Sequence, residues 1–259
     1  MSRPSRPTIL VTNDDGITSR GLHALASALR DLGDVTIIAP DHNWSISGHQ
    51  KALNRFLRAD PYELPDLPVP TFASSGSPAD CVALAFLGLL ERKPDLIVSG
   101  INIAANLGQD ITYSGTVSAT FEAAIFGHPA VAVSLDTRDP DADFGDAAAV
   151  ATRIARRVAE EGLPRHTVLN VNVPAIPAGE WRGIAITRLG VRDYTDELVT
   201  GLDPLGRPYY WITGHPPGGD VTTEGTDIWA VHHGYVSVTP IRLDMTDEHL
   251  VEQVQRWEF

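Results

Sequence analysis

Short apolar runs alternate with amphipathic stretches along the first part of the chain. Residues 8–12 and 35–39 are β-branched and apolar and end at turn residues, which predicts two buried strands. Between them, apolar residues recur at helical spacing from Leu22 to Leu32 and stop before Gly33. A strand, a helix and a second strand in this order indicate a parallel sheet with helices on its faces.

Apolar runs and amphipathic stretches continue to alternate until the composition of the chain changes. After about residue 188, glycine, proline and aromatic residues become frequent, and we expect no further helix before residues 247–257. We interpret residues 1–259 as a single α/β domain, with a core at about 8–187 and a β-hairpin arm with a C-terminal tail at about 188–259. Within the core, the pattern predicts helices at residues 78–91, 117–126 and 147–158, and strands at 95–99, 130–135 and 166–173.

Composition and charge argue against some classes of binding partner and indicate the cell compartment. The formal net charge of -13 argues against binding to a nucleic-acid polymer or an anionic membrane. The single cysteine, Cys81, excludes a disulfide framework and a cysteine-based zinc site, which favours a reducing compartment. The first seven residues contain no apolar targeting segment, so we expect a short loose tail and a cytoplasmic protein.

Polar residues follow each of the first three predicted strands. Because ligands of open parallel sheets bind at the carboxyl ends of the strands, we expect these segments to converge on one crevice. They are Asn13-Asp14-Asp15-Gly16 after the first strand, residues 40–48 with Asn43, Ser45 and Ser47 after the second, and Ser99-Gly-Ile-Asn102 after the third.

The adjacent carboxylates of Asp14 and Asp15 point to a cation. Two such groups repel each other at neutral pH unless a positive charge lies beside them, and oxygen ligands select magnesium or manganese over zinc. Asn, Asp and Gly are also the residues that turns prefer, so an idle turn is the alternative. The position of the pair after a buried strand favours the metal site.

A second candidate segment runs from Asn102 to Val117, between a predicted strand and a predicted helix. Small hydroxyl and glycine residues that open a helix offer free backbone N–H groups to a phosphate. An ordinary Ser or Thr N-cap would explain Ser114, Gly115 and Thr116 equally well. The chain has no dinucleotide-binding or Walker-type glycine motif, which argues against those ligands.

Taken together, these residues resemble the SurE family of survival-protein nucleotidases. The resemblance implies a Rossmann-like, doubly wound core, one divalent cation (Mg²⁺ or Mn²⁺) and hydrolysis of nucleoside 5′-monophosphates, with 3′-monophosphates and polyphosphate as further possible substrates. It rests on Thr12-Asn-Asp-Asp-Gly16, Ala39-Pro-Asp41 with Ser45 and Gly48-His49, Gly76-Ser-Pro-Ala-Asp-Cys81, Ser99-Gly-Ile-Asn102, Asn106-Leu-Gly108 and Tyr113-Ser-Gly-Thr-Val117.

The resemblance also implies roles for individual residues. The metal ligands would be Asp14, Asp15, Ser45 and Asn102, and the catalytic residues Asp14, Asp15, Asn106 and Ser114. Asn106, Ser114, Gly115 and Thr116 would border the phosphate, and Gly48 and His49 are further candidates for substrate contact, although a structural histidine is an equal alternative. The C-terminal arm would exchange between subunits of a homodimer or homotetramer; an arm folded on its own domain is the other reading.

The chain departs from the family pattern in two places. Ala104 stands where the family usually has glycine, and alanine takes a positive φ only at a cost. Trp44 and Ile46 flank Ser45, where basic or small residues are common. They are candidates for contacting a base, and core packing would explain them equally well. We assign no role to His232 and His233, because consecutive residues of a strand face opposite sides.

Several mechanisms fit this set of residues. Water can attack the phosphorus directly, or Asp14 or Asp15 can act as general base or as a nucleophile that forms an aspartyl phosphate. The alternative to an enzyme is a non-catalytic, receiver-like module that binds metal and phosphate. Such modules need an acceptor aspartate and a lysine after later strands, and Ser99 to Asn102 supplies neither.

Overall fold

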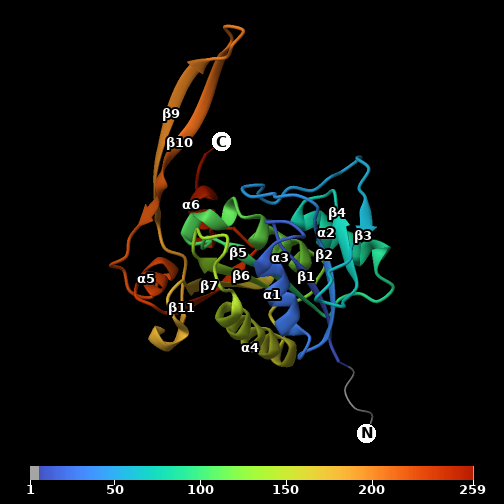
Figure 1. Cartoon of the computed structure of the whole chain (residues 1–259). Coiled ribbons are helices and arrows are strands. Elements are labelled where there is room, and N and C mark those ends of the chain that lie inside the picture. The colour runs from blue at the N-terminus through green and yellow to red at the C-terminus, as the bar shows by residue number, and fades with distance from the viewer. Residues whose placement is uncertain (1–5, 259) are drawn as a thin grey trace.

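The computed structural model describes residues 6–258, so residues 1–5 of the expected N-terminal tail lie outside the described residues. Its centre is a nine-stranded sheet in the order β3-β4-β2-β1-β5-β6-β7-β11-β8, with helices on both faces (Figure 1). The predicted α/β class with a mainly parallel sheet is confirmed, because only the pairings of β3 with β4 and of β11 with β7 are antiparallel. The strands at the centre are β1 (Thr8–Thr12), β2 (Asp34–Pro40), β5 (Leu96–Ile103), β6 (Ala130–Asp136) and β7 (Thr167–Pro174).

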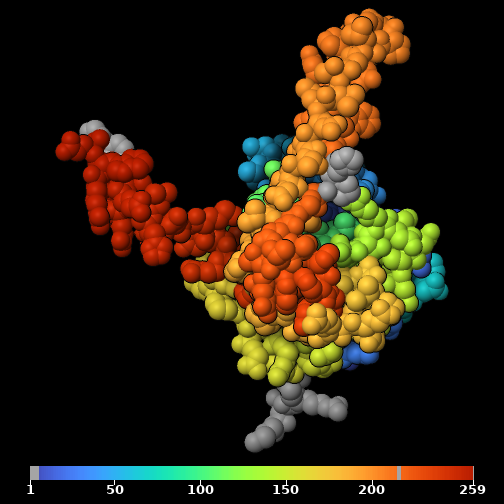
Figure 2. Space-filling model, turned by 90° about the vertical axis from the view of Figure 1, so that its left-hand side faces the viewer, coloured from blue at the N-terminus to red at the C-terminus, as the bar shows by residue number. Residues whose placement is uncertain are grey.

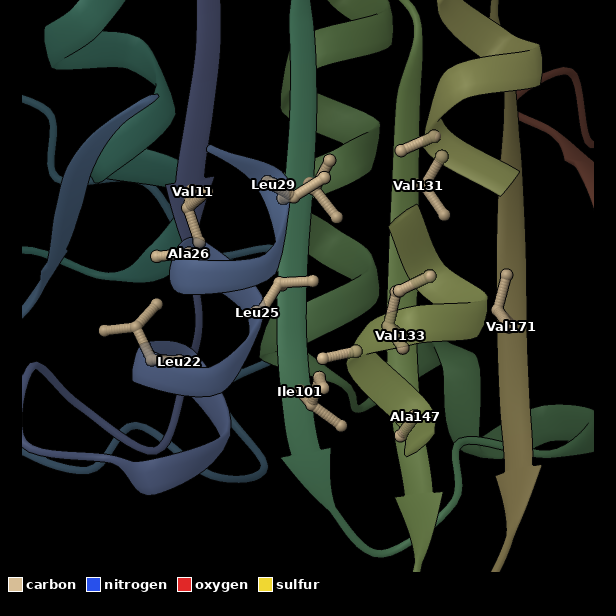
Figure 3. Packing of buried hydrophobic residues seen from close by; sticks show 14 of the residues in the cluster. Val11, Leu22, Leu25, Ala26, Leu29, Ile101, Val131, Val133, Ala147 and Val171 are labelled. Atoms are coloured by element: carbon tan, nitrogen blue, oxygen red, sulfur yellow. The ribbon is translucent and has the colours of Figure 1, made fainter. Parts of the chain in front are cut away.

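Two layers of helices bury the faces of this sheet. Helices α1 (Arg20–Leu29) and α4 (Gly145–Glu161) pack together on one face, and α2 (Pro78–Leu84) and α3 (Gly115–Ile125) on the other. Figure 3 shows the apolar stripe of α1 from Leu22 to Leu29 lying against residues of β1 and β5. Burial of strand residues on both faces explains why these strands are apolar runs without alternation.

The structure adds strands that the pattern did not predict. They are β3 (Ala59–Pro61), β4 (Thr71–Ser74), β8 (Ile184–Ile186) and β11 (Val236–Arg242). Strand β11 lies between β7 and β8, so the chain returns to the main sheet after the hairpin. The segment 188–259 is therefore an arm only in part.

Two helix predictions need correction. The expected absence of helices between residues 188 and 247 is wrong, because α5 spans Asp227–His232 and is capped by Thr226. Its six residues are too few to show a helical period in the sequence. The helix expected at 78–91 changes to a π-helical segment at Ala85–Leu89, in which Gly88 has a φ of 129°.

Two segments project from the body of the molecule. Strands β9 (Arg192–Leu202) and β10 (Pro208–Gly219) form a separate antiparallel hairpin, and helix α6 (Glu248–Val254) follows β11. Figure 2 shows the hairpin and the C-terminal segment extending in different directions. Among residues 6–258, no helix combines the length and the apolar character that a membrane crossing needs.

Candidate functional site

The candidate site lies where the order of the strands reverses. From β1 the chain moves to β2 on one side, and it later returns to β5 on the other side of β1. Asp14 and Asp15 follow β1, and Asn102 lies near the end of β5. The carboxyl ends of neighbouring parallel strands at such a reversal form a crevice that is open to ligands.

The turn after β1 is shaped by Asn13 and Gly16. The buried Asn13 side chain donates from Nδ2 to the Gly16 carbonyl, and its Oδ1 accepts from the Gly16 N–H. Gly16 has a φ of 100°, a conformation that favours glycine. These two residues fix the turn and leave the carboxylates between them for other contacts.

Asp14 is buried and bound to the start of α3. Its Oδ2 accepts from the Thr116 N–H at 3.1 Å, and its Oδ1 accepts from the Thr116 hydroxyl. The positive end of the α3 dipole also favours the carboxylate. Burial nevertheless raises the pKa of Asp14 above its ordinary value, although the Thr116 hydrogen bonds lower it.

Gly115 is needed for this contact. A Cβ atom at this position would lie 2.7 Å from Cβ of Asp14 and 2.9 Å from Oγ of Ser47. Only a glycine allows α3 to approach Asp14 so closely.

Asp15 is less buried and accepts the Ile103 N–H at 3.2 Å. Burial and the negative charge of Asp14 raise the pKa of Asp15 to about 6. Among the ion pairs between described residues, none includes Asp14 or Asp15. No ion pair among the described residues therefore offsets the negative charge of this pair when the two groups are ionised, and both pKa values are raised.

Asn102 lines the cleft and keeps an acceptor oxygen. Its Nδ2 donates to the Ala104 carbonyl at 2.8 Å, which leaves Oδ1 as an acceptor. Ala104 has a φ of 77°, the left-handed region that usually holds glycine. The loop thus has a backbone conformation that favours glycine, although the residue at this position is alanine.

Ser45 lies on a more exposed loop. The Trp44 N–H donates to the Asp14 carbonyl at 2.7 Å, and the Ser45 N–H donates to Oδ1 of Asn43 at 2.7 Å. Ile46 is 80% exposed and has a φ of 62°, which a β-branched residue rarely adopts. This loop is therefore strained beside its candidate ligand.

A cleft of about 1440 Å³ joins these segments. The sequence-predicted residues Asp14, Ser45, Asn102, Asn106 and Ser114 all line it. The described residues that line the cleft do not include Asp15, Gly48, His49, Gly115 and Thr116.

Asn106 and Ser114 are held firmly at the cleft. The Asn106 N–H donates to Asn172 Oδ1, its carbonyl accepts from Asn170 and Asn172, and its Nδ2 donates to Ser134 Oγ at 2.8 Å. The Ser114 hydroxyl caps α3 by accepting the Val117 N–H, so its proton is free to be donated into the cleft.

The contacts of Thr116 differ from those expected of a phosphate-bordering residue. Its N–H and hydroxyl both bind Asp14, so these donors are already used. The amide-rich segment at the start of α3 therefore orients a carboxylate. The sequence could not distinguish these two partners, since both are anions at a helix N-terminus.

His49 lies in a different network. Its Nε2 is 3.0 Å from Oε2 of Glu122, and Nζ of Lys51 is 2.5 Å from Oε1 of the same buried glutamate. Burial raises the pKa of Glu122, but hydrogen bonds from His49 and Lys51 outweigh this effect and lower it overall. Gly48 donates its N–H to the Tyr113 carbonyl. These contacts fasten the second loop to α3.

Sequence reasoning missed several residues of the cleft. Arg192 and Tyr194 of β9 both bind Asp110, with Nε of Arg192 2.7 Å from Oδ2. Asp136, directly at the end of β6, also lines the cleft, and the strand-end rule applied to that strand would have found it. Arg192 and Tyr194 could not be found in this way, because the arm meets the cleft only in the folded chain.

His232 requires a correction as well. It is the last residue of α5 rather than part of a strand, and it lines the cleft with Ile228 and Val231.

The donors at the cleft suit a hard divalent cation. Among the described residues, no three His, Cys, Asp or Glu side chains gather closely enough to hold a metal. A metal here would therefore need the oxygens of Ser45 and Asn102 besides the two carboxylates. Such an all-oxygen set fits Mg²⁺ or Mn²⁺, and a cation there would offset the negative charge of Asp14 and Asp15.

Comparisons with known proteins show which family the chain resembles. Residues 9–196 match the family model "Survival protein SurE". The chain is 50% identical to a protein called 5′-nucleotidase SurE from Chloroflexus aggregans, over 97% of this chain and 99% of the relative. It is 49% identical to 5′-nucleotidase SurE 1 from Thermus thermophilus, over 94% and 95% of the two chains. The crystal structure of the SurE protein from Aquifex aeolicus matches with a TM-score of 0.80 and 43% identity, over 96% of this chain and 98% of that one. On this evidence the chain belongs to the SurE family.

Proposed function

We propose that this protein is a divalent-metal-dependent 5′-nucleotidase, which hydrolyses nucleoside 5′-monophosphates to nucleoside and phosphate. The observation that carries the proposal is the buried Asp14 with its neighbour Asp15, neither of them in an ion pair among the described residues, at a cleft that Asp14, Asn106 and Ser114 line. The names of the relatives support it over nearly the whole length of the chain.

Asp14, Asp15, Ser45 and Asn102 would hold the cation. A bound divalent cation supplies positive charge to the phosphoryl oxygens and lowers the pKa of a water molecule. The residues themselves set its position: Thr116 and Gly115 orient Asp14, the Ile103 N–H orients Asp15, and Ala104 orients Asn102.

Ser114 and Asn106 would bind the phosphoryl group. The Ser114 hydroxyl can donate a proton into the cleft while its oxygen caps α3. Asn106 is fixed by side chains from β6 and β7 and has little freedom to move. Donors held in place before the reaction stabilise developing negative charge at low reorganisation cost.

The hydrolytic step breaks the bond between phosphorus and the nucleoside oxygen. Direct attack by water places the new oxygen on phosphate, and the leaving oxygen takes a proton. Attack by Asp14 or Asp15 would instead form an aspartyl phosphate first. The stereochemical course at phosphorus separates the two, because direct attack by water inverts a chiral phosphoryl group, whereas the two displacements of an aspartyl-phosphate route retain its configuration.

The central test is phosphate release from a panel of nucleoside 5′- and 3′-monophosphates and polyphosphate. Each is measured with Mn²⁺, with Mg²⁺ and with a chelator, which also establishes the preferred metal. We expect release with metal and none with chelator. Activity that persists with chelator would overturn the metal assignment.

We also propose a cytoplasmic, single-domain protein that assembles as a homodimer or homotetramer through its C-terminal arm. Large apolar side chains along the hairpin are exposed, among them Leu198, Tyr210, Trp211 and Ile212. Surfaces of this kind usually meet a partner. Light scattering of the full chain and of a variant lacking residues 195–213 would give the two masses; an unchanged oligomer would contradict the arm's role.

A further inference from the structure

The cleft has an aromatic wall beside the phosphoryl-binding residues. Tyr113 directly precedes Ser114, and its ring is 6.4 Å from the ring of Tyr194, with the two planes at 85°. Both tyrosines line the cleft, and 56% of Tyr113 and 41% of Tyr194 are exposed. The rings therefore pair edge to face and still leave surface open to a ligand.

This wall is held in place on both sides. The Tyr194 hydroxyl donates to Oδ1 of Asp110 at 2.8 Å, and Arg192 binds the other oxygen of the same carboxylate. The Tyr113 carbonyl accepts the Gly48 N–H, and the Tyr113 N–H donates to the Asp110 carbonyl. Asp110 thus connects the base of the arm to the loop that ends at Ser114.

From this geometry we infer that the nucleobase of the substrate stacks against Tyr113 and Tyr194. The inference rests on the proposed nucleotidase function. Ser114 and Tyr113 line the same cleft, so a phosphate at Ser114 would leave the attached nucleoside within the cleft that the two tyrosine rings also line. An aromatic face attracts every nucleobase and reads none of its edges, so this wall accepts purines and pyrimidines alike.

Another part of the cleft lining, the aliphatic wall, has a different chemistry. Ile228, Val231 and Ala105 are aliphatic and buried, and they belong to one small apolar cluster. Such a surface offers no aromatic face for a base. The phenol group of Tyr194 stays neutral at physiological pH, because burial and the hydrogen bond to Asp110 raise its pKa to about 12.

The test compares AMP, UMP and ribose 5-phosphate, which carries the phosphate without a base. In Tyr113→Leu we expect KM for AMP to rise about tenfold, as the loss of one stacking ring implies. The value of kcat for AMP and both constants for ribose 5-phosphate should stay within about twofold of wild type. Tyr113→Phe keeps the ring and should restore the AMP value.

Tyr194→Leu should act in the same direction with a smaller effect, since its ring is less exposed. Tyr62→Leu is the matched control, because Tyr62 follows β3 and is not among the described residues that line the cleft. If KM in Tyr113→Leu rises equally for AMP and ribose 5-phosphate, or rises for neither, the inference is overturned. A rise in KM for AMP in Val231→Ala but not in Tyr113→Leu would place the base on the aliphatic wall instead.

Adenosine separates this inference from the proposed function. Saturation-transfer NMR with adenosine measures base binding without any hydrolysis. We expect transfer to the adenine protons in wild type and its loss in Tyr113→Leu. If no nucleotide releases phosphate and adenosine still binds through Tyr113, only the proposed function fails; if adenosine shows no transfer in wild type, the stacking wall is wrong.

Discussion

The two halves of the candidate metal site are built differently. Asp14 is buried, and two donors of Thr116 hold its carboxylate. Ser45 lies on an exposed loop, and Ile46 beside it has a φ of 62°. One half is fixed by the hydrogen bonds that join Asp14, in the turn after β1, to the start of α3, and the other by a few loop contacts.

This difference indicates that the two halves of the candidate site have different roles. In the proposed mechanism the fixed half would set where the cation and the phosphoryl group lie, because it is part of the sheet and helix core. The loop half can adjust when substrate enters, since few apolar contacts restrain it. Substitutions in the fixed half should therefore cost more than equivalent ones in the loop.

The largest expected effect is on Asp14. Asp14→Asn removes the buried negative charge, and we expect kcat/KM for AMP with Mn²⁺ to fall more than about 100-fold, beyond the effect typical of residues that only orient metal ligands. Ser45→Ala should cost about tenfold or less. Equal losses in the two variants, with both folded by circular dichroism, would remove the distinction between the halves.

Gly115→Ala tests how tightly α3 packs against Asp14. The new Cβ would lie 2.7 Å from Cβ of Asp14, so the helix must shift. We expect the free energy of unfolding to drop by about 2 kcal/mol and activity to fall with it. Gly179→Ala is the matched control, since a Cβ there has nothing within 4 Å. Equal stability of the two variants in urea titrations would count against a rigid contact at Asp14.

The fixed half was also the more predictable one from the sequence. Asp14 and Asn102 follow apolar runs that pair inside the sheet, so local pattern alone placed them at one edge. The order of strands β1 and β2 and the helix between them followed from the same pattern. The strand pattern suffices where a site residue lies at the end of a regular parallel strand, because the carboxyl ends of such strands share one edge of the sheet.

Long-range contacts account for what the sequence did not reveal. Arg192 and Tyr194 reach Asp110 from a hairpin about eighty residues away, and no periodicity marks that meeting. Strand β11 pairs with β7, although the whole β9–β10 hairpin lies between these two strands in the sequence. We predicted that Thr116 borders the phosphate, because the N–H groups at a helix N-terminus bind a phosphate and a carboxylate equally well.

Glu122 should control how firmly the loop half is anchored. Glu122→Gln removes the charge that holds His49 and Lys51, and we expect about 1.5 kcal/mol of stability to be lost at pH 7. The pKa of Glu122 is lowered from 4.5 in the folded state, so this contribution is complete above about pH 4.5. It is lost as the pH falls through the folded-state value.

Urea titrations of wild type and Glu122→Gln at pH 7 and at successively lower pH values measure this difference. The gap between the two proteins should narrow on acidification. A gap that is constant or widens would show that the pair with His49 and Lys51 does not anchor the loop. Activity should fall less than in Gly115→Ala, because Glu122 does not touch the Asp14 half directly.

The smallest expected effect, and one of opposite sign, is at Ala104. Its φ of 77° costs an alanine roughly 1 kcal/mol, which a glycine avoids, although glycine gives the unfolded chain more freedom. Ala104→Gly should therefore leave stability unchanged or raise it by up to about 1 kcal/mol, whereas Ala175→Gly, at an exposed position without a positive φ, should lower it. If the strain serves to aim Asn102 through its bond to the Ala104 carbonyl, the more stable variant should bind Mn²⁺ more weakly in calorimetry. Unchanged Mn²⁺ affinity would mean that the fixed half holds Asn102 without help from the strained residue, and that the alanine is merely tolerated.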